Sequence, residues 1–217
     1  MDTKKKELIG DFKNAGRTWS KQPDEVNAHD FRQDAEHIAS PYGIYDLTHN
    51  TGLVYIGASA DTSEFAVDAI EHWWKTEGRS RYPKADKLLI LADAGGSNGC
   101  RFRLFKQKIQ ERLADLHALE VTLAHYPTGA SKWNPVEHRL FGPISCNWQG
   151  IPLRSLDIMV RCIRGTKTTT GLHVDAFLTD NKYEKGIRVS DREMKRINIQ
   201  RHHVCPAWNY TIYPRLE

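Results

Sequence analysis

Two apolar runs, each followed by a polar turn and a helical pattern, constrain the fold of this chain more than any other feature. The first run, residues 88–92 (LLILA), lacks polar alternation, so we predict a strand that is buried on both faces. The second run, residues 119–125, has the length and β-branched content of another buried strand. The order strand, helix, strand, helix across residues 88–148 therefore predicts an α/β layer.

An acidic residue follows each of these runs. Asp93 stands between the first run and a glycine-rich turn, so its carboxylate lies at the C-terminal end of a strand, where open α/β sheets place their sites. Glu137 lies at the start of the helix after the second run, with Asn134 at the N-cap and Pro135 at the first helical position. Asn134 and Glu137 also have the spacing of a capping box, which would make Glu137 structural. The residues alone leave both interpretations open.

The N-terminal part of the chain predicts a strand followed by a long irregular segment. Residues 3–12 predict a strand that opens abruptly at the chain start, directly after Asp2. An acid at position 2 is equally typical of a frayed terminus. Residues 13–40 carry many polar groups and predict a long loop or insertion, with isolated anchors at Trp19, His29 and Phe31.

A hairpin and a helix are predicted next. Residues 42–46 and 53–58 flank a turn-rich spacer, which indicates a β-hairpin. Asp61 and Glu64 have the spacing of a capping box at the start of a helix. The adjacent residues Trp73 and Trp74 lie on the apolar side of that helix, so we predict that they belong to the core.

Length and composition exclude several classes of protein. The 217 residues suffice for one large or two small domains with a sizeable core. No window is apolar over the roughly 18 residues that a membrane span requires, and the charged N-terminus has no apolar signal-peptide core. We therefore predict a cytoplasmic protein without a membrane partner. The four cysteines are scattered and form no C-x-x-C pair, so we expect free thiols.

The charge of the chain is unevenly distributed. The net charge is +4, and from Arg154 onward 12 Lys and Arg residues oppose 7 Asp and Glu residues. A basic excess of this kind suits contact with phosphates, although ordinary solvated surfaces share it. Charge alone favours nucleic acid only slightly.

If Asp2, Asp93 and Glu137 converge, they supply what two-metal phosphodiester chemistry requires. Carboxylates are hard oxygen ligands that suit Mg²⁺. Because close carboxylates repel one another, such a cluster favours a divalent cation over an empty site.

Several stretches together resemble a known family. They cover nearly the whole chain: DTKKKELIGDFKNAGRTW, HDF, PYGIYD, RSRYPKADKLLILADAGGSNG, SKWNPVEHRLF, TTTGL and WNYTIYP. Their combination resembles the catalytic domain of DDE transposases, and most closely the Rhodopirellula-type transposase DDE domain family of bacterial insertion sequences. The NPVE step is also similar to the NPIE step of mariner-like transposases. The resemblance implies a ribonuclease-H-like α/β fold, a mixed sheet flanked by helices, with a C-terminal helical and irregular extension.

The same resemblance implies roles for individual residues. Asp2 matches the first catalytic aspartate, Asp93 the second and Glu137 the glutamate, with 43 residues between the last two. Within the SKWNPVEHRLF signature, the resemblance implies contacts to the transposon end from Lys132, Trp133 and Arg139. Packing of Trp133, and pairing of Arg139 with a nearby acid, are alternatives that the sequence leaves open.

The implied activity is cleavage and strand transfer of DNA with two Mg²⁺ ions, for which Mn²⁺ can substitute. The implied partners are the transposon ends and target DNA, and further copies of the chain in the active assembly. A cytoplasmic protein of this kind would associate with the nucleoid when bound to DNA.

For domain organisation, we predict a catalytic domain over residues 1–150 and a C-terminal extension over residues 151–217 that packs on it. Family members normally carry a helix-turn-helix region and several apolar strand residues before the first aspartate, where this chain has only Met1. We therefore expect an N-terminally truncated transposase. The alternatives are an inactive remnant that binds DNA or intact transposase, and a ribonuclease-H-like nuclease that hydrolyses strands without joining them.

Overall fold

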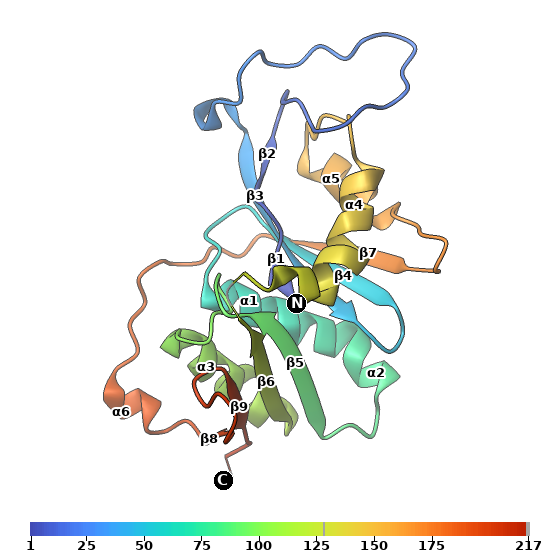
Figure 1. The fold of residues 1–217 in the computed structure, drawn as a ribbon. Helices are drawn as coiled ribbons and strands as arrows, with labels where there is room; N and C mark the ends of the chain where they lie inside the picture. Colours follow the sequence, from blue (N-terminus) through green and yellow to red (C-terminus); the bar gives the residue numbers. More distant parts are fainter. Residues whose placement is uncertain (128, 216–217) are drawn as a thin grey trace. The chain divides into compact units, whose positions relative to one another are not determined.

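The computed structural model describes residues 1–127 and 129–215 of the chain. These residues form two compact units, and the chain passes between them several times. Unit 1 consists of Met1–Asp2, Ala60–Asn134 and Tyr183–Glu217, and unit 2 consists of Thr3–Ser59 and Pro135–Lys182. Figure 1 labels the helices and strands of both units. Each unit therefore holds residues from both sides of position 150, and the predicted boundary there stays a prediction.

Unit 1 is a four-stranded mixed sheet with helices. Its strand order is β5-β6-β9-β8, in which β5 and β6 are parallel and β9 is antiparallel to both of its neighbours. The elements of unit 1 are α1 (Ser63–Trp73), η2 (Trp74–Gly78), α2 (Arg79–Arg81), β5 (Lys87–Asp93), α3 (Arg103–Ile109), η3 (Gln110–Asp115), β6 (Glu120–Tyr126), η4 (Ser131–Trp133), α6 (Asp191–Met194), β8 (Ile199–Arg201) and β9 (Asn209–Ile212).

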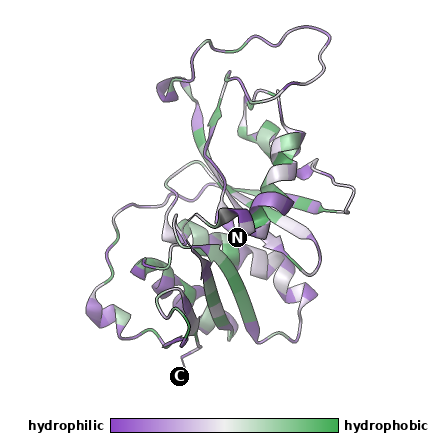
Figure 2. Ribbon diagram, viewed as in Figure 1, coloured by the Kyte–Doolittle hydropathy of each residue, from purple (hydrophilic) through white to green (hydrophobic). Residues whose placement is uncertain are grey.

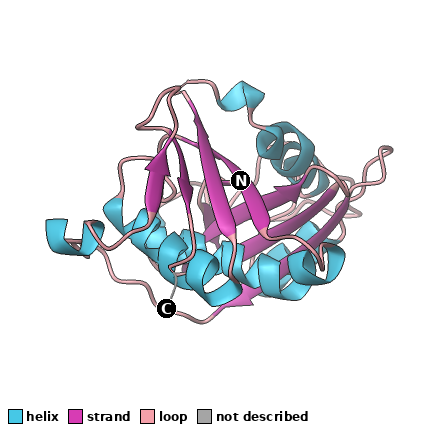
Figure 3. Ribbon diagram, turned by 90° about the horizontal axis from the view of Figure 1, so that it is seen from below, coloured by secondary structure: helices cyan, strands magenta, loops and turns pink. Residues whose placement is uncertain are grey.

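One face of this sheet forms the core of unit 1. Every second residue of β6 is buried, which is the pattern of a strand with one covered face. Figure 3 shows the helices alongside the strands, and Figure 2 shows that β5 and β6 are hydrophobic along much of their length. The buried side chains of α1, α3 and η3 include Phe65, Ile70, Phe105, Ile109 and Leu113.

Unit 2 is organised around a second mixed sheet. The strand order is β1-β3-β4-β7, with β2 also paired to β3; β3 and β4 form an antiparallel hairpin, and β7 runs parallel to β4. The division between the units falls within β1 (Asp2–Thr3). The other elements of unit 2 are β2 (Glu7–Ile9), η1 (Arg32–Asp34), β3 (His37–Asp46), β4 (Thr51–Gly57), η5 (Glu137–Phe141), α4 (Gly142–Asn147), α5 (Leu156–Arg164) and β7 (His173–Thr179).

The core of unit 2 joins this sheet to the helices that follow Asn134. Buried apolar residues of β3, β4 and β7 pack with those of η5, α4 and α5 in one cluster that includes Val54, Leu140, Ile144, Met159 and Val174. The segment from residue 10 to residue 31 contains no helix or strand and forms the long loop between β2 and β3 in Figure 1.

The predicted α/β class is confirmed, since both sheets are mixed and both units contain helices. The predicted hairpin is β3–β4, and the predicted helix is α1 continued by η2, with Trp73 and Trp74 buried in the core. Its N-cap is Thr62, whose side chain accepts from the N–H of Phe65, one residue later than predicted.

Other predictions about local structure are wrong. In place of one strand over residues 3–12 there are two short strands, β1 and β2, which span residues 2–9 and are separated by Lys4, Lys5 and Lys6. Strand β3 begins at His37, within the predicted loop. Trp19 is fully exposed and Phe31 is 56% exposed, so neither anchors that loop in the core. The strand β5 lies at one end of its sheet order, and Leu89 is 62% exposed, so β5 is not buried on both faces.

The C-terminal part contributes more to the fold than an irregular extension would. Strand β9, in the tail, pairs with β6 in the interior of the unit 1 sheet, and its Tyr210 and Ile212 are fully buried. All four cysteines are free, as predicted. Among the described residues, no helix combines the length and the apolar character that crossing a bilayer demands.

Candidate active site

Asp93 is the last residue of β5, where the strand gives way to the glycine-rich loop 94–99. It is half-buried and pairs in register with Tyr126 of the parallel strand β6. Burial and the nearby charge of Asp93 raise the pKa of the Tyr126 hydroxyl. The Asp93 carboxylate therefore lies beside the neutral phenol of Tyr126 at the C-terminal end of a parallel strand pair.

Asn134 connects Asp93 to the start of the chain. Its side-chain Nδ2 donates to Asp93 Oδ1 at 3.1 Å and lies 3.5 Å from the backbone oxygen of Met1. The ammonium group of Met1 in turn donates to the carbonyl of Leu91 at 2.7 Å, two residues before Asp93 on β5. Asn134 is fully buried, so these contacts are shielded from solvent.

These contacts bring two predicted site residues to the same end of unit 1. Asp2 follows Met1 directly, is half-buried, and belongs to β1. Its backbone neighbour Met1 is fixed against β5 next to Asp93, so position 2 is an ordered part of the structure and not a frayed terminus. From the sequence we predicted only an N-cap role for Asn134. Its position in the SKWNPVEHRLF signature was the one feature of the sequence that could have indicated a role at the site.

The loop after Asp93 is held by a buried histidine. His125, next to Tyr126 on β6, places Nε2 3.0 Å from the carbonyl of Asn98 and Nδ1 2.8 Å from the carbonyl of Trp208. Burial lowers the pKa of His125 in spite of these two carbonyl contacts. The neutral ring carries one N–H, so it donates to one of the two carbonyls. The hydroxyl of Ser63 donates to the carbonyl of Ser97 at 2.8 Å and fixes the same loop from α1.

Asn98 leaves hydrogen-bonding capacity unused in this loop. Its side chain is fully buried, and within the described part of the chain neither its Nδ2 nor its Oδ1 has a hydrogen-bond partner. Buried amides without partners are uncommon in native proteins and are often found at functional sites. The unpaired amide lies five residues after Asp93.

Glu137 lies in unit 2, at the start of the π-helix η5, and is half-buried. Residues 135 and 136 are already helical, so Pro135 takes the first helical position as predicted, directly after Asn134. π-helical turns are rare in proteins, and those that do occur frequently lie at functional sites. Glu137 is thus three residues along the chain from the asparagine that contacts Asp93.

Two glycines let η5 pack closely on the sheet of unit 2. A Cβ atom at Gly43 of β3 would lie 2.4 Å from Cε1 of Phe141, and one at Gly52 of β4 would lie 2.3 Å from Cδ1 of Leu140. Both distances are far below van der Waals contact. The absence of side chains at these two glycines therefore leaves room for the helical turn that carries Glu137 to pack against the β3–β4 hairpin.

The predicted DNA-contact residues are on the surface. Trp133 is 68% exposed, so the alternative that it packs in the core is wrong. Lys132 is also exposed, and its Nζ lies 5.3 Å from the centre of the Trp133 ring. Arg139, in unit 2, is exposed and forms no ion pair with any residue that the structure describes. A cation, an aromatic ring and a second cation are therefore accessible within eight residues of sequence.

Asp2 and Asp93, both in unit 1, have carboxylate side chains, the donor type that suits a hard divalent cation. Within residues 1–127 and 129–215, no three His, Cys, Asp or Glu side chains are grouped closely enough to hold a metal ion.

The fold belongs to the class of α/β proteins, which place their sites at the C-terminal ends of parallel strands, and Asp93 lies at such an end. Within that class, the chain belongs to the Rhodopirellula transposase DDE domain family, whose family model matches residues 1–214. The predicted family is thereby confirmed. No curated protein and no solved structure compared with the chain matches it significantly.

Proposed function

We propose that this transposase domain cleaves DNA strands and joins them at insertion-sequence ends in an Mg²⁺-dependent reaction, with Asp2, Asp93 and Glu137 as the three metal-binding carboxylates. The observation that carries the proposal is the pair of contacts from Asn134, which reaches the Asp93 carboxylate and the residue before Asp2. The family supports DNA as the substrate.

Asp93 has the central role in this proposal. Its Oδ1 accepts from the Asn134 amide, which fixes the rotation of the carboxylate. A hydrogen bond from a residue that does not itself bind the metal orients a metal-binding side chain in one geometry. Asp2 would contribute a second carboxylate from the strand that begins beside Leu91, and Glu137 a third from the turn packed on Gly43 and Gly52.

When bound, divalent ions of this class lower the pKa of an attacking hydroxyl and stabilise the charge on the leaving oxygen. In strand cleavage the attacking oxygen belongs to water, and in strand transfer it belongs to a 3′-hydroxyl. Each step forms one phosphorus–oxygen bond and breaks another, and the proton of the attacking group passes to solvent or to a carboxylate. The three acidic side chains therefore position the reacting groups, and the reaction involves no change of oxidation state.

Lys132, Trp133 and Arg139 are the DNA contacts in this proposal. All three are exposed, and the cations suit phosphates, which bind Lys and Arg through charge. The exposed ring of Trp133 suits stacking on a base or sugar. Their position on both sides of Asn134 and Glu137 along the chain keeps DNA contact and metal binding in one short segment.

The test is a cleavage assay on supercoiled plasmid that carries the DNA flanking the gene, with Mg²⁺ or Mn²⁺. Asp93→Asn should lower the cleavage rate by more than about 100-fold, because it removes a charged ligand and not merely the outer contact that orients one. The matched control is Asp86→Asn, which neutralises an exposed aspartate just before the other end of the same strand.

Two outcomes would contradict the proposal. Cleavage by Asp93→Asn at the wild-type rate would exclude Asp93 as a metal ligand. Binding of DNA by the wild-type chain without any cleavage would instead support the alternative of an inactive remnant.

A further inference from the structure

The long loop between β2 and β3 forms two hollows in unit 2. The first has a volume of about 620 Å³ and is lined by residues on both sides of β2 and by the start of the loop, with Arg32 at the loop's far end. The second has a volume of about 490 Å³ and lies between the loop and the turn that contains Gly150. Lys13 and Asn14 line both, so the two hollows adjoin one another.

These hollows are basic. Their charged lining consists of six cations and three anions: Lys5, Lys6, Lys13, Arg17, Lys21 and Arg32, with Glu7, Asp24 and Asp30. We call the six cations the loop cations. All six are exposed, and none forms an ion pair with another described residue.

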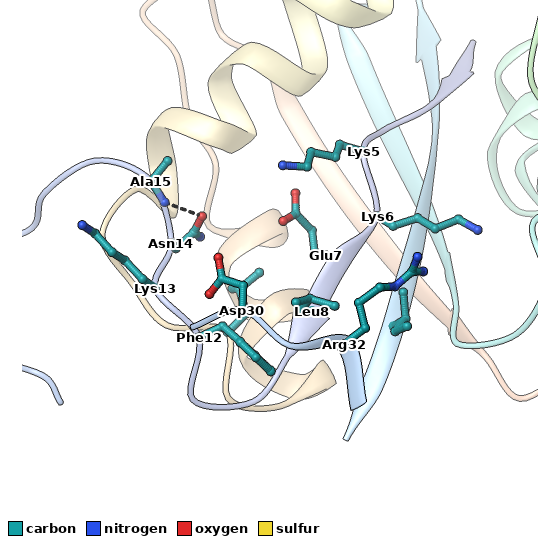
Figure 4. A pocket seen from close by; sticks show the side chains of 12 residues that line it. Lys5, Lys6, Glu7, Leu8, Phe12, Lys13, Asn14, Ala15, Asp30 and Arg32 are labelled. Atoms are coloured by element: carbon teal, nitrogen blue, oxygen red, sulfur yellow. Dashed lines mark hydrogen bonds between the residues drawn. The ribbon is translucent and has the colours of Figure 1, made fainter. Parts of the chain in front are cut away.

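Two of the three anions already have cationic partners outside the lining. Glu7 accepts from Nζ of Lys4 at 2.7 Å, and Asp24 pairs with Arg154 at 3.1 Å. Figure 4 shows that the side chains of Lys5 and Glu7 point toward the segment that carries Asn14. The side chain of Lys6 points in the opposite direction, and that of Lys13 points outward from the Asn14 segment. The loop cations are therefore left facing solvent with little compensation, which favours an anionic ligand.

Several contacts close this loop at its base. Arg154 pairs with Asp11 at 2.5 Å and with Asp24, and donates to the carbonyl of Glu25 at 3.1 Å, so one guanidinium ties residue 11 to residues 24 and 25. The amide of Asn14 donates to the carbonyls of Trp148 and Ile151 at 3.1 and 3.3 Å. These contacts close the segment into a compact loop of the kind that often carries function.

Trp19 lies within this closed loop, two residues after Arg17 and two before Lys21 in the sequence, and its side chain is fully exposed. A tryptophan in full contact with water gains nothing from the hydrophobic effect in the folded chain. Proteins that stack an unpaired base while holding the strand by its phosphates combine exposed aromatic rings with cations.

We propose that this loop is a second DNA contact, separate from the segment at residues 132–139, in which the loop cations bind the phosphates of a strand and Trp19 stacks on an unpaired base. DNA as the ligand rests on the proposed function, whereas the surface itself does not depend on any carboxylate of the active site. The ligand class is therefore DNA with a single-stranded arm, such as a nicked or opened end.

The test measures binding of two fluorescent probes, a duplex with a single-stranded arm and the matching blunt duplex. The measurement uses the full chain with Asp93→Asn and a chelator, so that no cleavage occurs. The pair Arg17→Ala and Lys21→Ala should weaken binding of the armed probe about tenfold and reduce the salt slope by about 1.4 to 1.8, because two phosphate contacts are lost. The matched control is Arg79→Ala with Lys84→Ala, two exposed cations of unit 1 that have no ion pair among the described residues.

Substitutions of Trp19 test the stacking separately. Trp19→Leu should weaken binding of the armed probe about fivefold or more without changing the salt slope, because the ring carries no charge. Trp19→Phe should retain most of the affinity, and neither variant should change binding of the blunt duplex.

The proposal is wrong if the Arg17 and Lys21 variant binds like the Arg79 and Lys84 control, or if Trp19→Leu binds both probes like the wild type. In either case a cleavage defect of Asp93→Asn would still stand, and the proposed function with it. Absence of DNA binding by the wild-type chain would overturn both.

Discussion

A paired arginine of unit 1 and the loop cations of unit 2 show two different uses of cationic side chains. In unit 1, Arg112 pairs with Asp68 at 2.6 Å and with Glu71 at 2.5 Å, and both carboxylates are almost fully buried. In unit 2, the six loop cations lie exposed around two hollows and pair with no described residue. Paired cations contribute to folding, whereas exposed unpaired ones are available for a ligand.

Within unit 1, the acidic groups differ from one another in the same way. Asp68 and Glu71 belong to the fold, since burial raises the pKa of Asp68, and the cations Lys75 and Arg112 outweigh burial to lower that of Glu71. Asp93 forms no ion pair with any residue that the structure describes, and it accepts from the neutral amide of Asn134.

The largest expected effect tests whether both units contribute to catalysis. Glu137→Gln, in unit 2, should lower the cleavage rate by more than about 100-fold, as Asp93→Asn does in unit 1, because both would remove a charged metal ligand. Plasmid cleavage with each variant is the measurement. A capping role alone would instead change the stability of unit 2 by about 1 kcal/mol and leave cleavage nearly intact.

A smaller effect tests the difference between paired and unpaired cations. Arg112→Met leaves Asp68 and Glu71 buried without their shared partner, so the free energy of unfolding should fall by about 1–3 kcal/mol. Arg17→Met, which removes an exposed loop cation, should change it by less than about 0.5 kcal/mol. Urea unfolding of both variants is the measurement. Equal losses would show that the loop cation supports the fold.

The smallest expected effect is a pH dependence of unit 1. Burial depresses the pKa of His125 below its usual value of 6.5, so the unfolded chain binds a proton near that pH and the folded chain does not. The free energy of unfolding should therefore fall as the pH drops below about 6.5, by at most about 1.4 kcal/mol per pH unit for this group.

His125→Gln should flatten this dependence, as unfolding at several pH values would show. His117 is a control, because burial also lowers its pKa but its ring lies nearer the surface. A larger change with His117→Gln than with His125→Gln would contradict the assignment.

The sequence predicted elements whose signals are local. The hairpin β3–β4, the helix α1, and the strands β5 and β6 follow from apolar periodicity and turn residues within a few positions. Asp93 could be placed at a strand end for the same reason. The family followed from motifs that span the chain.

What the sequence did not reveal depends on contacts between distant residues. β9 has only four residues in a tail without periodicity, and it forms because β6 offers it a neighbouring edge. The contact of Asn134 with Asp93 joins residues 41 positions apart. We expected a basic surface from the excess of cations after Arg154, but the cations around the two hollows come from residues 5–32. The acids of that segment offset these cations, so the net charge of the segment did not indicate a basic surface.

The central claim is that Asp2, Asp93 and Glu137 bind divalent metal together, and a calorimetric titration of Mn²⁺ into the full chain tests it most directly. Wild-type protein should bind Mn²⁺, and Asp2→Asn, Asp93→Asn and Glu137→Gln variants of confirmed fold should each bind it more weakly, with Asp86→Asn as the unaffected control. The titration should be repeated with bound DNA, which brings its own phosphate ligands. Affinity that stays at the wild-type value in all three variants, with and without DNA, would contradict the account.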